Sequence, residues 1–299
     1  MRNLHWTGEN IPNQENRIVV ITGATSGLGK QATKVLAGKN ARVIMAVRNI
    51  EKAKAVVSEI QKDFPEAKID IRQLDLNSLK SVQDFAEAFT SEYQQLDILI
   101  NNAGVMMCPY ATTKDGFEIQ MGTNHLGHFA LTGRLMPTLL NTKNSRVVST
   151  SSMAHKQGNI NFDDLNWESR DYNAVKAYSD SKIANLYFTS ELVRKYKGHD
   201  NAPIFTSAHP GWTKTELDRH SGIVAFIGNF TAQKVEMGTL PSLRAATDLD
   251  AKSGDYFGPK SLFEARGYPV IVQPNKMAQN ETNAKRLWDI SEQLTGVKY

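Results

Sequence analysis

Two side chains in the second half of the chain have the types and spacing needed for proton transfer. Tyr178 and Lys182 lie four residues apart in the segment Ala177-Tyr-Ser-Asp-Ser-Lys-Ile-Ala-Asn185. Residues at i and i+4 share one face of a helix, so the phenol and the ammonium would point the same way. A nearby ammonium favours phenolate and draws the tyrosine pKa down from its reference value of about 10. Such a tyrosine can exchange a proton with an alcohol or a carbonyl, although an exposed helical pair would show the same spacing.

A glycine-rich turn near the N-terminus has the features of a phosphate-binding site. The turn, Thr22-Gly-Ala-Thr-Ser-Gly-Leu-Gly29, follows a short apolar run and opens a predicted helix. Glycine allows backbone to approach phosphate closely, and a helix N-terminus attracts negative charge. The spacing G-x-x-x-G-x-G departs from the G-x-G-x-x-G dinucleotide fingerprint, and a plain tight turn would also use glycine. The residues expected to contact a dinucleotide are Gly23, Thr25, Ser26, Gly27, Leu28 and Gly29.

The end of the second predicted strand, Ala46-Val-Arg-Asn49, indicates which dinucleotide would bind. Sites selective for NAD place a carboxylate there for the ribose 2′-hydroxyl, whereas NADP sites use an arginine for the 2′-phosphate. Arg48 stands at this position and can bind phosphate through charge-assisted hydrogen bonds. A solvated surface arginine is the alternative interpretation. We expect NADP(H) as the cofactor.

The next two strands end in motifs that could border the same ligand. Leu74-Asp-Leu76 ends the third strand, where Asp75 could accept a hydrogen bond from the adenine amino group or serve as a helix N-cap. Asn101-Asn-Ala-Gly104 ends the fourth strand, and its small residues could let backbone lie against the cofactor or form a plain turn. The further cofactor contacts expected from these motifs are Asp75, Leu76, Asn102, Ala103 and Gly104.

The elements that would position these residues alternate along the chain. Largely apolar runs predict strands at residues 17–22, 42–47, 97–100, 146–150 and 204–208, and a further strand is predicted at residues 68–74. Between them, patterns typical of helices cover residues 29–36, 50–63, 78–93, 114–140 and 175–197. Such alternation favours a parallel sheet covered on both faces, with right-handed crossovers. No linker-like change in composition interrupts it, so we expect residues 1–299 to form a single doubly wound domain.

Composition excludes several classes of function. The 299 residues are 40% hydrophobic and 22% charged with a net charge of +4, and no basic run supports binding of nucleic acid or of a membrane surface. Cys108 is the one cysteine, so no intrachain disulfide can form. The N-terminal residues lack the apolar region of a secretory signal, and no stretch approaches the roughly 18–20 apolar residues of a membrane span. A cytoplasmic location is the expectation.

Three segments depart from the alternation of strands and helices. Residues 1–16 are polar and are predicted to form a leader that lies over the surface. Residues 153–174, rich in Asn, Asp and Gly, form a predicted long loop just before the helix of Tyr178. Residues 216–240 contain an apolar cluster at 223–230 and are predicted to form a lid over the substrate, with simple packing onto the domain as the alternative.

Taken together, these motifs resemble the short-chain dehydrogenase/reductase superfamily over nearly the whole chain. The resemblance rests on the glycine turn, Asp75-Leu76, Asn101-Asn-Ala-Gly104, Ser151-Ser152, Tyr178-Ser-Asp-Ser-Lys182 and Pro210-Gly211. The chain is most similar to the subgroup of retinol dehydrogenases, WW-domain oxidoreductases and protochlorophyllide reductases. That likeness rests on Asn124-His-Leu-Gly-His-Phe129, Ser151-Ser-Met-Ala-His155, His209-Pro-Gly211 and Arg286-Leu-Trp-Asp-Ile-Ser-Glu-Gln-Leu-Thr-Gly296. The predicted fold is a Rossmann-type domain with a parallel seven-stranded sheet in the order 3-2-1-4-5-6-7.

The resemblance implies a role for each matching residue. Tyr178 would be the general acid/base and Lys182 its electrostatic partner, also bonding the nicotinamide ribose. Ser152 would hydrogen-bond the substrate carbonyl, with Ser151 as a possible substitute, and Asn124 would brace a water molecule that links Lys182 to solvent. The remaining contacts implied, at the nicotinamide end, are Asn124, Tyr178, Lys182, Pro210, Gly211, Thr213 and Thr215.

The expected activity is hydride transfer between NADP(H) and an aldehyde or ketone with an apolar body, or the matching alcohol. Reduction of a carbon–carbon double bond and a non-catalytic NADP(H)-binding interaction protein are the alternatives. His125 and His128, three apart on a predicted helix, are interpreted as packing residues, and no metal is expected. A homodimer and a monomer are both compatible with the sequence, because the 153–174 loop could block a helix face used for pairing in many relatives.

Overall fold

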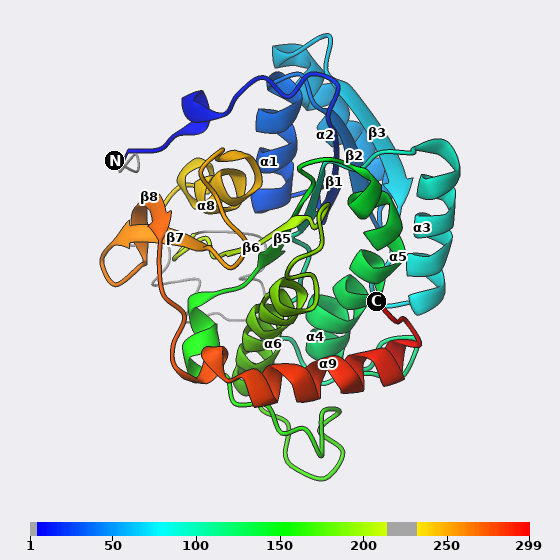
Figure 1. The fold of residues 1–299 in the computed structure, drawn as a ribbon, viewed down its shortest axis with the longest axis vertical. Helices are drawn as coiled ribbons and strands as arrows, with labels where there is room; N and C mark the ends of the chain where they lie inside the picture. The colour runs from blue at the N-terminus through cyan, green and yellow to red at the C-terminus, as the bar shows by residue number, and fades with distance from the viewer. Residues whose placement is uncertain (1–4, 214–231) are drawn as a thin grey trace.

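The computed structural model describes residues 5–213 and 232–299, which form one twisted sheet between two layers of helices (Figure 1). Within these residues the sheet has eight strands in the order β3-β2-β1-β4-β5-β6-β7-β8. Their bounds are β1 Ile18–Thr22, β2 Arg42–Val47, β3 Lys68–Gln73, β4 Ile98–Asn101, β5 Arg146–Thr150, β6 Ile204–Ala208, β7 Tyr256–Ser261 and β8 Arg266–Ile271. The first seven pair in parallel, as predicted.

The eighth strand corrects the predicted seven-stranded parallel sheet. β8 pairs antiparallel with β7, and only residues 262–265 connect the two strands. A parallel pair needs a crossover of a dozen or more residues, so a connection this short permits only a hairpin. The antiparallel strand at this edge follows from the length of its turn.

The apolar strand sequences are explained by burial on both faces of the sheet. Alternate residues of β1 point to opposite sides, so Val19 and Ile21 pack in one core cluster and Val20 in the other. A strand that lies between two helical layers must be apolar at every position, which is the pattern seen in the sequence.

Each face of the sheet carries its own set of helices. The first set is α1 (Gly27–Gly38), α2 (Ile50–Asp63) and α8 (Val235–Thr247), with α1 packed against α8. The second set is α3 (Leu79–Glu92), α5 (Gly127–Asn141) and α6 (Ala174–Lys195), with α9 (Glu281–Thr295) lying across α6 (Figure 1). The segments β7, β8, α8 and α9 were not assigned from the sequence.

The long helix predicted for residues 114–140 begins later and is not regular. Residues 112 and 118 form an isolated bridge, and α4 (Ile119–Met121) follows. A π-helical turn, η2 (Gly122–Leu126), then leads into α5. π-turns are rare and occur frequently at functional sites. This one carries Asn124.

The three irregular segments have different outcomes. In the described part of the leader, Trp6 and Ile11 are buried in the first core cluster. The 153–174 loop begins with the 3₁₀-helix η3 (Met153–Gln157) and buries Trp167, over which the Arg170 guanidinium stacks at 3.5 Å. Of the predicted lid, residues 216–231 lie outside the described residues, and residues 235–240 form the first turns of α8.

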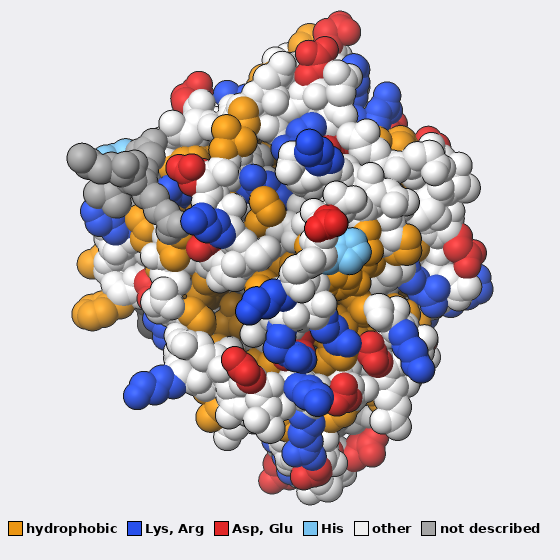
Figure 2. Space-filling view, in the orientation of Figure 1, with side chains coloured by type: hydrophobic (Ala, Val, Ile, Leu, Met, Phe, Trp, Pro, Cys, Tyr) orange, Lys and Arg blue, Asp and Glu red, His pale blue; other side chains and the backbone are white. Residues whose placement is uncertain are grey.

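The surface has no single dominant charge on the face shown in Figure 2, where basic and acidic side chains are interspersed. Among the described helices, none combines the length and apolar character needed to cross a bilayer.

Candidate active site

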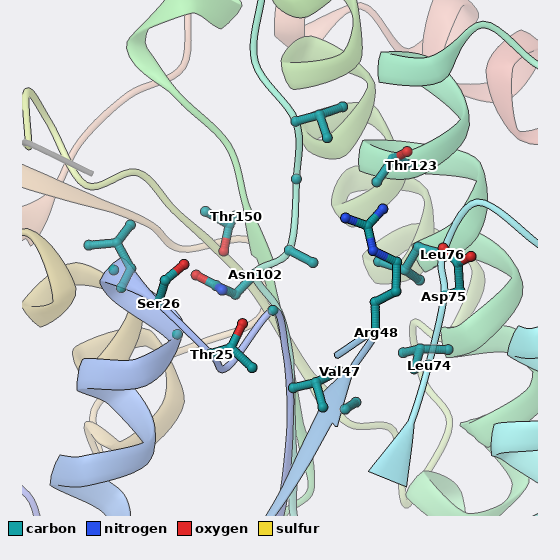
Figure 3. A pocket seen from close by; sticks show the side chains of 18 of the residues that line it. Thr25, Ser26, Val47, Arg48, Leu74, Asp75, Leu76, Asn102, Thr123 and Thr150 are labelled. Carbon is teal, nitrogen blue, oxygen red and sulfur yellow. The ribbon is translucent and has the colours of Figure 1, made fainter. Parts of the chain in front are cut away.

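A cavity of about 480 Å³ opens at the carboxyl ends of the parallel strands (Figure 3). It lies where the strand order reverses between β1 and β4, the position at which open α/β sheets bind ligands. The structure brings these predicted residues to its lining: Gly23, Thr25, Ser26, Gly27, Leu28, Gly29, Arg48, Asp75, Leu76, Asn102, Ala103, Gly104, Tyr178, Lys182 and Pro210.

The glycine turn presents the start of α1 to this cavity. Gly23 and Gly27 have φ values of +67° and +49°, a left-handed conformation that favours glycine. Ser26 is the N-cap of α1, but its side chain makes no capping hydrogen bond. The first N–H groups of the helix are therefore not satisfied by this cap, which suits an anionic ligand.

Thr22 joins the glycine turn to the end of β4. Its hydroxyl oxygen accepts hydrogen bonds from the backbone N–H groups of Asn102 and Ala103, each at 2.9 Å. The Asn102 side-chain amide donates in return to the Thr22 carbonyl oxygen at 2.8 Å. These bonds fix the two strand ends that form the floor of the cavity.

Arg48 extends from the end of β2 on the opposite side of the cavity from Thr25 and Ser26 (Figure 3). Asn49 and Lys52 line the same region, and neither was predicted from the sequence. Their sequence positions could have indicated this, because both residues belong to the capped first turn of α2 directly after Arg48.

Asp75 lines the cavity but is not the helix cap that was its alternative interpretation. The N-cap of α3 is Ser78, whose side chain accepts from the Ser81 N–H. The Asp75 carboxylate instead accepts from the Asn77 N–H at 3.1 Å and pairs with Lys114 at 3.1 Å.

Tyr178 and Lys182 occupy the inner end of the cavity on α6, which Asn173 caps. The Lys182 ammonium lies 5.5 Å from the centre of the Tyr178 ring and 3.4 Å from the Thr150 carbonyl oxygen. Burial lowers the pKa of Lys182 from 10.5 to about 8, because the charged form loses its hydration. An ammonium held beside a phenol in this way can stabilise phenolate.

Asn124 lies behind the cavity, outside its lining, and is fully buried. Its side-chain oxygen accepts from the Val105 N–H at 2.8 Å, and its amide donates to the Val105 carbonyl and to the Ser181 hydroxyl, each at 2.9 Å. A Cβ added at Gly104 would lie 3.0 Å from the Asn124 side-chain oxygen and 3.5 Å from the Lys182 ammonium. Asn124 and Lys182 thus approach the same point.

The two serines at the end of β5 have different environments. Ser151 lines the cavity, and its hydroxyl donates to the Lys182 carbonyl oxygen at 2.8 Å. Ser152 lies one position further, outside the lining, and caps η3 by accepting from the Ala154 N–H at 3.2 Å. Ser152 therefore keeps its hydroxyl proton available for another acceptor.

Among the described residues after β6, up to Thr213, Pro210 is the one that lines the cavity. Gly211 and Thr213 lie outside the lining, with Thr213 donating to the Pro210 carbonyl oxygen at 2.8 Å. Thr215 lies outside the described residues.

Four histidines near the site are buried. His125 and His128 follow Asn124, and burial lowers their pKa values to about 3 and about 4. His155 and His209 flank Tyr256, and burial lowers the pKa of both. Within the described ranges, no group of three or more His, Cys, Asp or Glu side chains is arranged to hold a metal ion.

Comparisons with known proteins agree with this architecture. The family model for short chain dehydrogenases matches residues 17–222. Human retinol dehydrogenase 11 is 42% identical over 286 residues, covering 94% of this chain and 86% of the human protein. Human retinol dehydrogenase 13 is 40% identical over 294 residues, covering 94% and 85%.

Solved structures extend the comparison. A protein from Mycobacterium paratuberculosis superposes with a TM-score of 0.83 at 41% identity, covering 99% of both chains. A short chain dehydrogenase from Shigella flexneri, solved as a complex with NADP, superposes with a TM-score of 0.66 at 26% identity, covering 83% of this chain and 98% of that one. From the family match and these relatives, the chain belongs to the short-chain dehydrogenase/reductase superfamily, within its retinol dehydrogenase subgroup.

Proposed function

We propose that this protein is an NADP(H)-dependent oxidoreductase that interconverts an aldehyde or ketone carrying an apolar body and the matching alcohol. The observation that carries the proposal is the buried Lys182 ammonium, 5.5 Å from the Tyr178 ring at the inner end of a glycine-lined cavity. A charged amine is costly to bury, so its retention beside a phenol is explained by a role in proton transfer.

The residues of the cavity fit a phosphorylated dinucleotide. The N-terminus of α1 lacks a side-chain cap and faces the cavity, as a diphosphate would require. Arg48 and Lys52 supply positive charge at the far end, suited to a 2′-phosphate. The Shigella flexneri relative was solved with NADP, which supports the same choice here.

When bound, the nicotinamide of NADPH supplies the hydride. The side chains of this protein transfer the proton and stabilise the negative charge that develops on the substrate oxygen. Ser152 and Tyr178 donate hydrogen bonds to the substrate oxygen, a form of stabilisation worth about 3–4 kcal/mol for each donor. Tyr178 then gives up its proton, and Lys182 stabilises the phenolate. In the oxidative direction the Tyr178 phenolate, stabilised by Lys182, takes the proton of the alcohol.

The test is NADPH oxidation with a panel of apolar aldehydes and ketones, before and after Tyr178→Phe. We expect the Phe variant to lose roughly 10²–10⁴-fold in kcat while still binding NADPH. Tyr187→Phe is the matched control, because Tyr187 is buried on the same helix and donates to the Met277 carbonyl, away from the cavity. Undiminished turnover by Tyr178→Phe would remove the proposed acid, and a product with its carbonyl intact would indicate double-bond reduction instead.

A further inference from the structure

The turn between β7 and β8 has an unusual left-handed backbone conformation. Three consecutive non-glycine residues, Leu262, Phe263 and Glu264, have φ values of +51°, +55° and +69°. Side chains disfavour this left-handed conformation, and such conformations persist when surrounding contacts enforce them, often near functional sites. Phe263 is 93% exposed, so packing of its side chain onto the described residues does not enforce the turn.

The Glu264 side chain points back to the body of the protein. Its carboxylate lies 3.3 Å from the His209 side chain and 3.2 Å from the Lys156 ammonium. His209 follows β6 and Lys156 belongs to η3, which Ser152 caps. One carboxylate thus joins the segments that follow two neighbouring strands.

A hydrogen bond from Gly211 sets the tautomer of the His209 imidazole. His209 Nδ1 accepts a hydrogen bond from the Gly211 N–H at 3.2 Å, so in the neutral ring the proton resides on Nε2. Nε2 lies 3.3 Å from the Glu264 carboxylate, an electrostatic contact that lacks the geometry of a hydrogen bond. The chain of contacts therefore runs from the carboxylate through the imidazole to the backbone of Gly211.

The same hairpin also holds this backbone directly. The Trp212 N–H donates to the Ala265 carbonyl oxygen at 2.8 Å. A Cβ at Gly211, whose φ is +66°, would lie only 2.5 Å from that oxygen, so the turn and the hairpin fit together only with glycine here. Immediately before Gly211, Pro210 lines the cavity that also holds Tyr178 and Lys182.

We infer that Glu264 is a positioning residue, which acts through His209 to hold the Pro210–Trp212 turn against the end of the cavity occupied by Tyr178. The inference rests on the proposed function, since that is the end where the nicotinamide would lie. The left-handed turn places both the Glu264 carboxylate and the Ala265 carbonyl against the segment from His209 to Trp212. These contacts account for its backbone conformation. Lys156 adds an ion pair that solvent screens, so the His209 contact carries the larger share.

Backbone amide exchange in the cofactor-free protein tests the positioning by itself. In Glu264→Ala we expect the amides of Gly211 and Trp212 to exchange at least tenfold faster than in the parent. Glu264→Gln keeps a polar side chain of the same length beside His209 and should exchange within threefold of the parent. Lys260→Ala, an exposed change on the same hairpin, is the control and should have no effect. Unchanged exchange in Glu264→Ala would overturn the inference.

Ligand binding then tests the link to the cavity, using NADPH and 2′,5′-ADP, which lacks the nicotinamide half. Glu264→Ala should weaken NADPH at least fivefold and leave the affinity for 2′,5′-ADP within twofold. Equal losses for both ligands would show general destabilisation and overturn the inference. If the parent protein bound neither ligand, the proposed function would fail, while the exchange experiment would still decide whether Glu264 holds the turn.

Discussion

The Thr22 hydroxyl and the His128 imidazole meet at 2.9 Å, joining the end of β1 to α5. His128 Nδ1 lies 3.0 Å from the Asn124 carbonyl oxygen, and as a donor there it leaves Nε2 to accept from Thr22. Thr22 also accepts from the N–H groups of Asn102 and Ala103. One hydroxyl therefore connects the glycine turn, the end of β4 and the π-turn of Asn124.

Replacing Thr22 by valine should destabilise the protein and loosen this junction. The change keeps the side-chain shape but leaves two partly buried N–H groups and one buried imidazole nitrogen without their partner. Leaving one buried polar group without its hydrogen-bond partner costs about 1–3 kcal/mol. We therefore expect the free energy of unfolding, measured in urea, to fall by at least about 1 kcal/mol. Thr90→Val on α3 removes only local bonds to the Ala86 and Glu87 carbonyls of the same helix and should change stability by less than about 0.5 kcal/mol. Equal effects of the two changes would contradict the junction.

The buried histidines predict a loss of stability in mild acid. Burial lowers the pKa of His125 to about 3, and of His128 and His155 to about 4, against about 6.5 in an unfolded chain. Between pH 6.5 and 5 the unfolded state therefore takes up protons that the folded state refuses. The free energy of unfolding keeps its full value above pH 6.5. Below that it falls as the pH decreases, by up to about 1.4 kcal/mol per pH unit for each histidine. Urea midpoints across this range measure the slope.

His128→Gln should make that slope shallower by up to about 1.4 kcal/mol per pH unit, because glutamine does not titrate. His199→Gln, at an exposed position, is the control for the substitution itself. An identical slope for His128→Gln and the parent would show that His128 is not kept neutral by the fold.

Lys182→Met should stabilise the protein while abolishing turnover. The pKa of Lys182 is lowered from 10.5 to about 8, so at pH 7 the folded state bears the cost of burying an ammonium. Methionine fills a similar volume without charge, and the Thr150 carbonyl keeps its bond from Asn185 at 2.9 Å. We expect the free energy of unfolding to rise by about 1–3 kcal/mol at pH 7.

The sign of that effect also predicts its pH dependence. The cost is fully present below pH 8 and is relieved as the pH rises from 8 toward 10.5, where the unfolded lysine deprotonates as well. The advantage of Lys182→Met should therefore shrink between pH 8 and pH 10. A variant less stable than the parent at pH 7 would mean that the ammonium makes stronger contacts than the Thr150 bond.

The apolar pattern located β1, β2, β4, β5 and β6 because these strands are buried between two helical layers, whereas β3, at the edge of the sheet, is only partly buried. Val19, Ile44 and Leu99 lie in unbroken apolar runs for this reason. The pair β7–β8 was missed because Pro259 and Pro269 are normally turn residues, yet they pair with each other next to an irregularity in the ladder. Proline is tolerated at such places because the ladder bonds are already interrupted.

The cavity lining could be predicted from local motifs, because each motif ends a strand at the same edge of the sheet. Contacts made between distant segments could not. Nothing near Glu264 in the sequence indicates that its carboxylate reaches His209 and Lys156. Ser78 rather than Asp75 caps α3, although both residue types favour caps, and only the position of the first helical turn distinguishes them.

Arg48→Asp should shift the cofactor preference from NADPH toward NADH. Arg48 lines the cavity at the end of β2, where an aspartate would repel a 2′-phosphate and accept from a 2′-hydroxyl. We expect kcat/KM for NADPH to fall at least tenfold while that for NADH is maintained or rises. Lys62→Asp, an exposed change near the end of α2, makes the same change in net charge and should leave the ratio unaltered. Similar efficiencies of the parent enzyme with NADH and NADPH would argue against Arg48 as a phosphate ligand.

Asp180 fastens the 153–174 loop to the helix of Tyr178. Its buried carboxylate accepts from the Asn159 N–H at 2.8 Å and pairs with Lys176, which donates to the Asn159 carbonyl at 2.7 Å. Asp180→Ala removes the charged acceptor of two hydrogen bonds, from the Asn159 N–H and from Lys176, so we expect stability to fall by about 1–3 kcal/mol and limited proteolysis within residues 158–172 to accelerate. Asp171→Ala, at an exposed position of the same loop, should change neither. Proteolysis of Asp180→Ala at the parent rate would show that burial of Trp167 alone secures the loop.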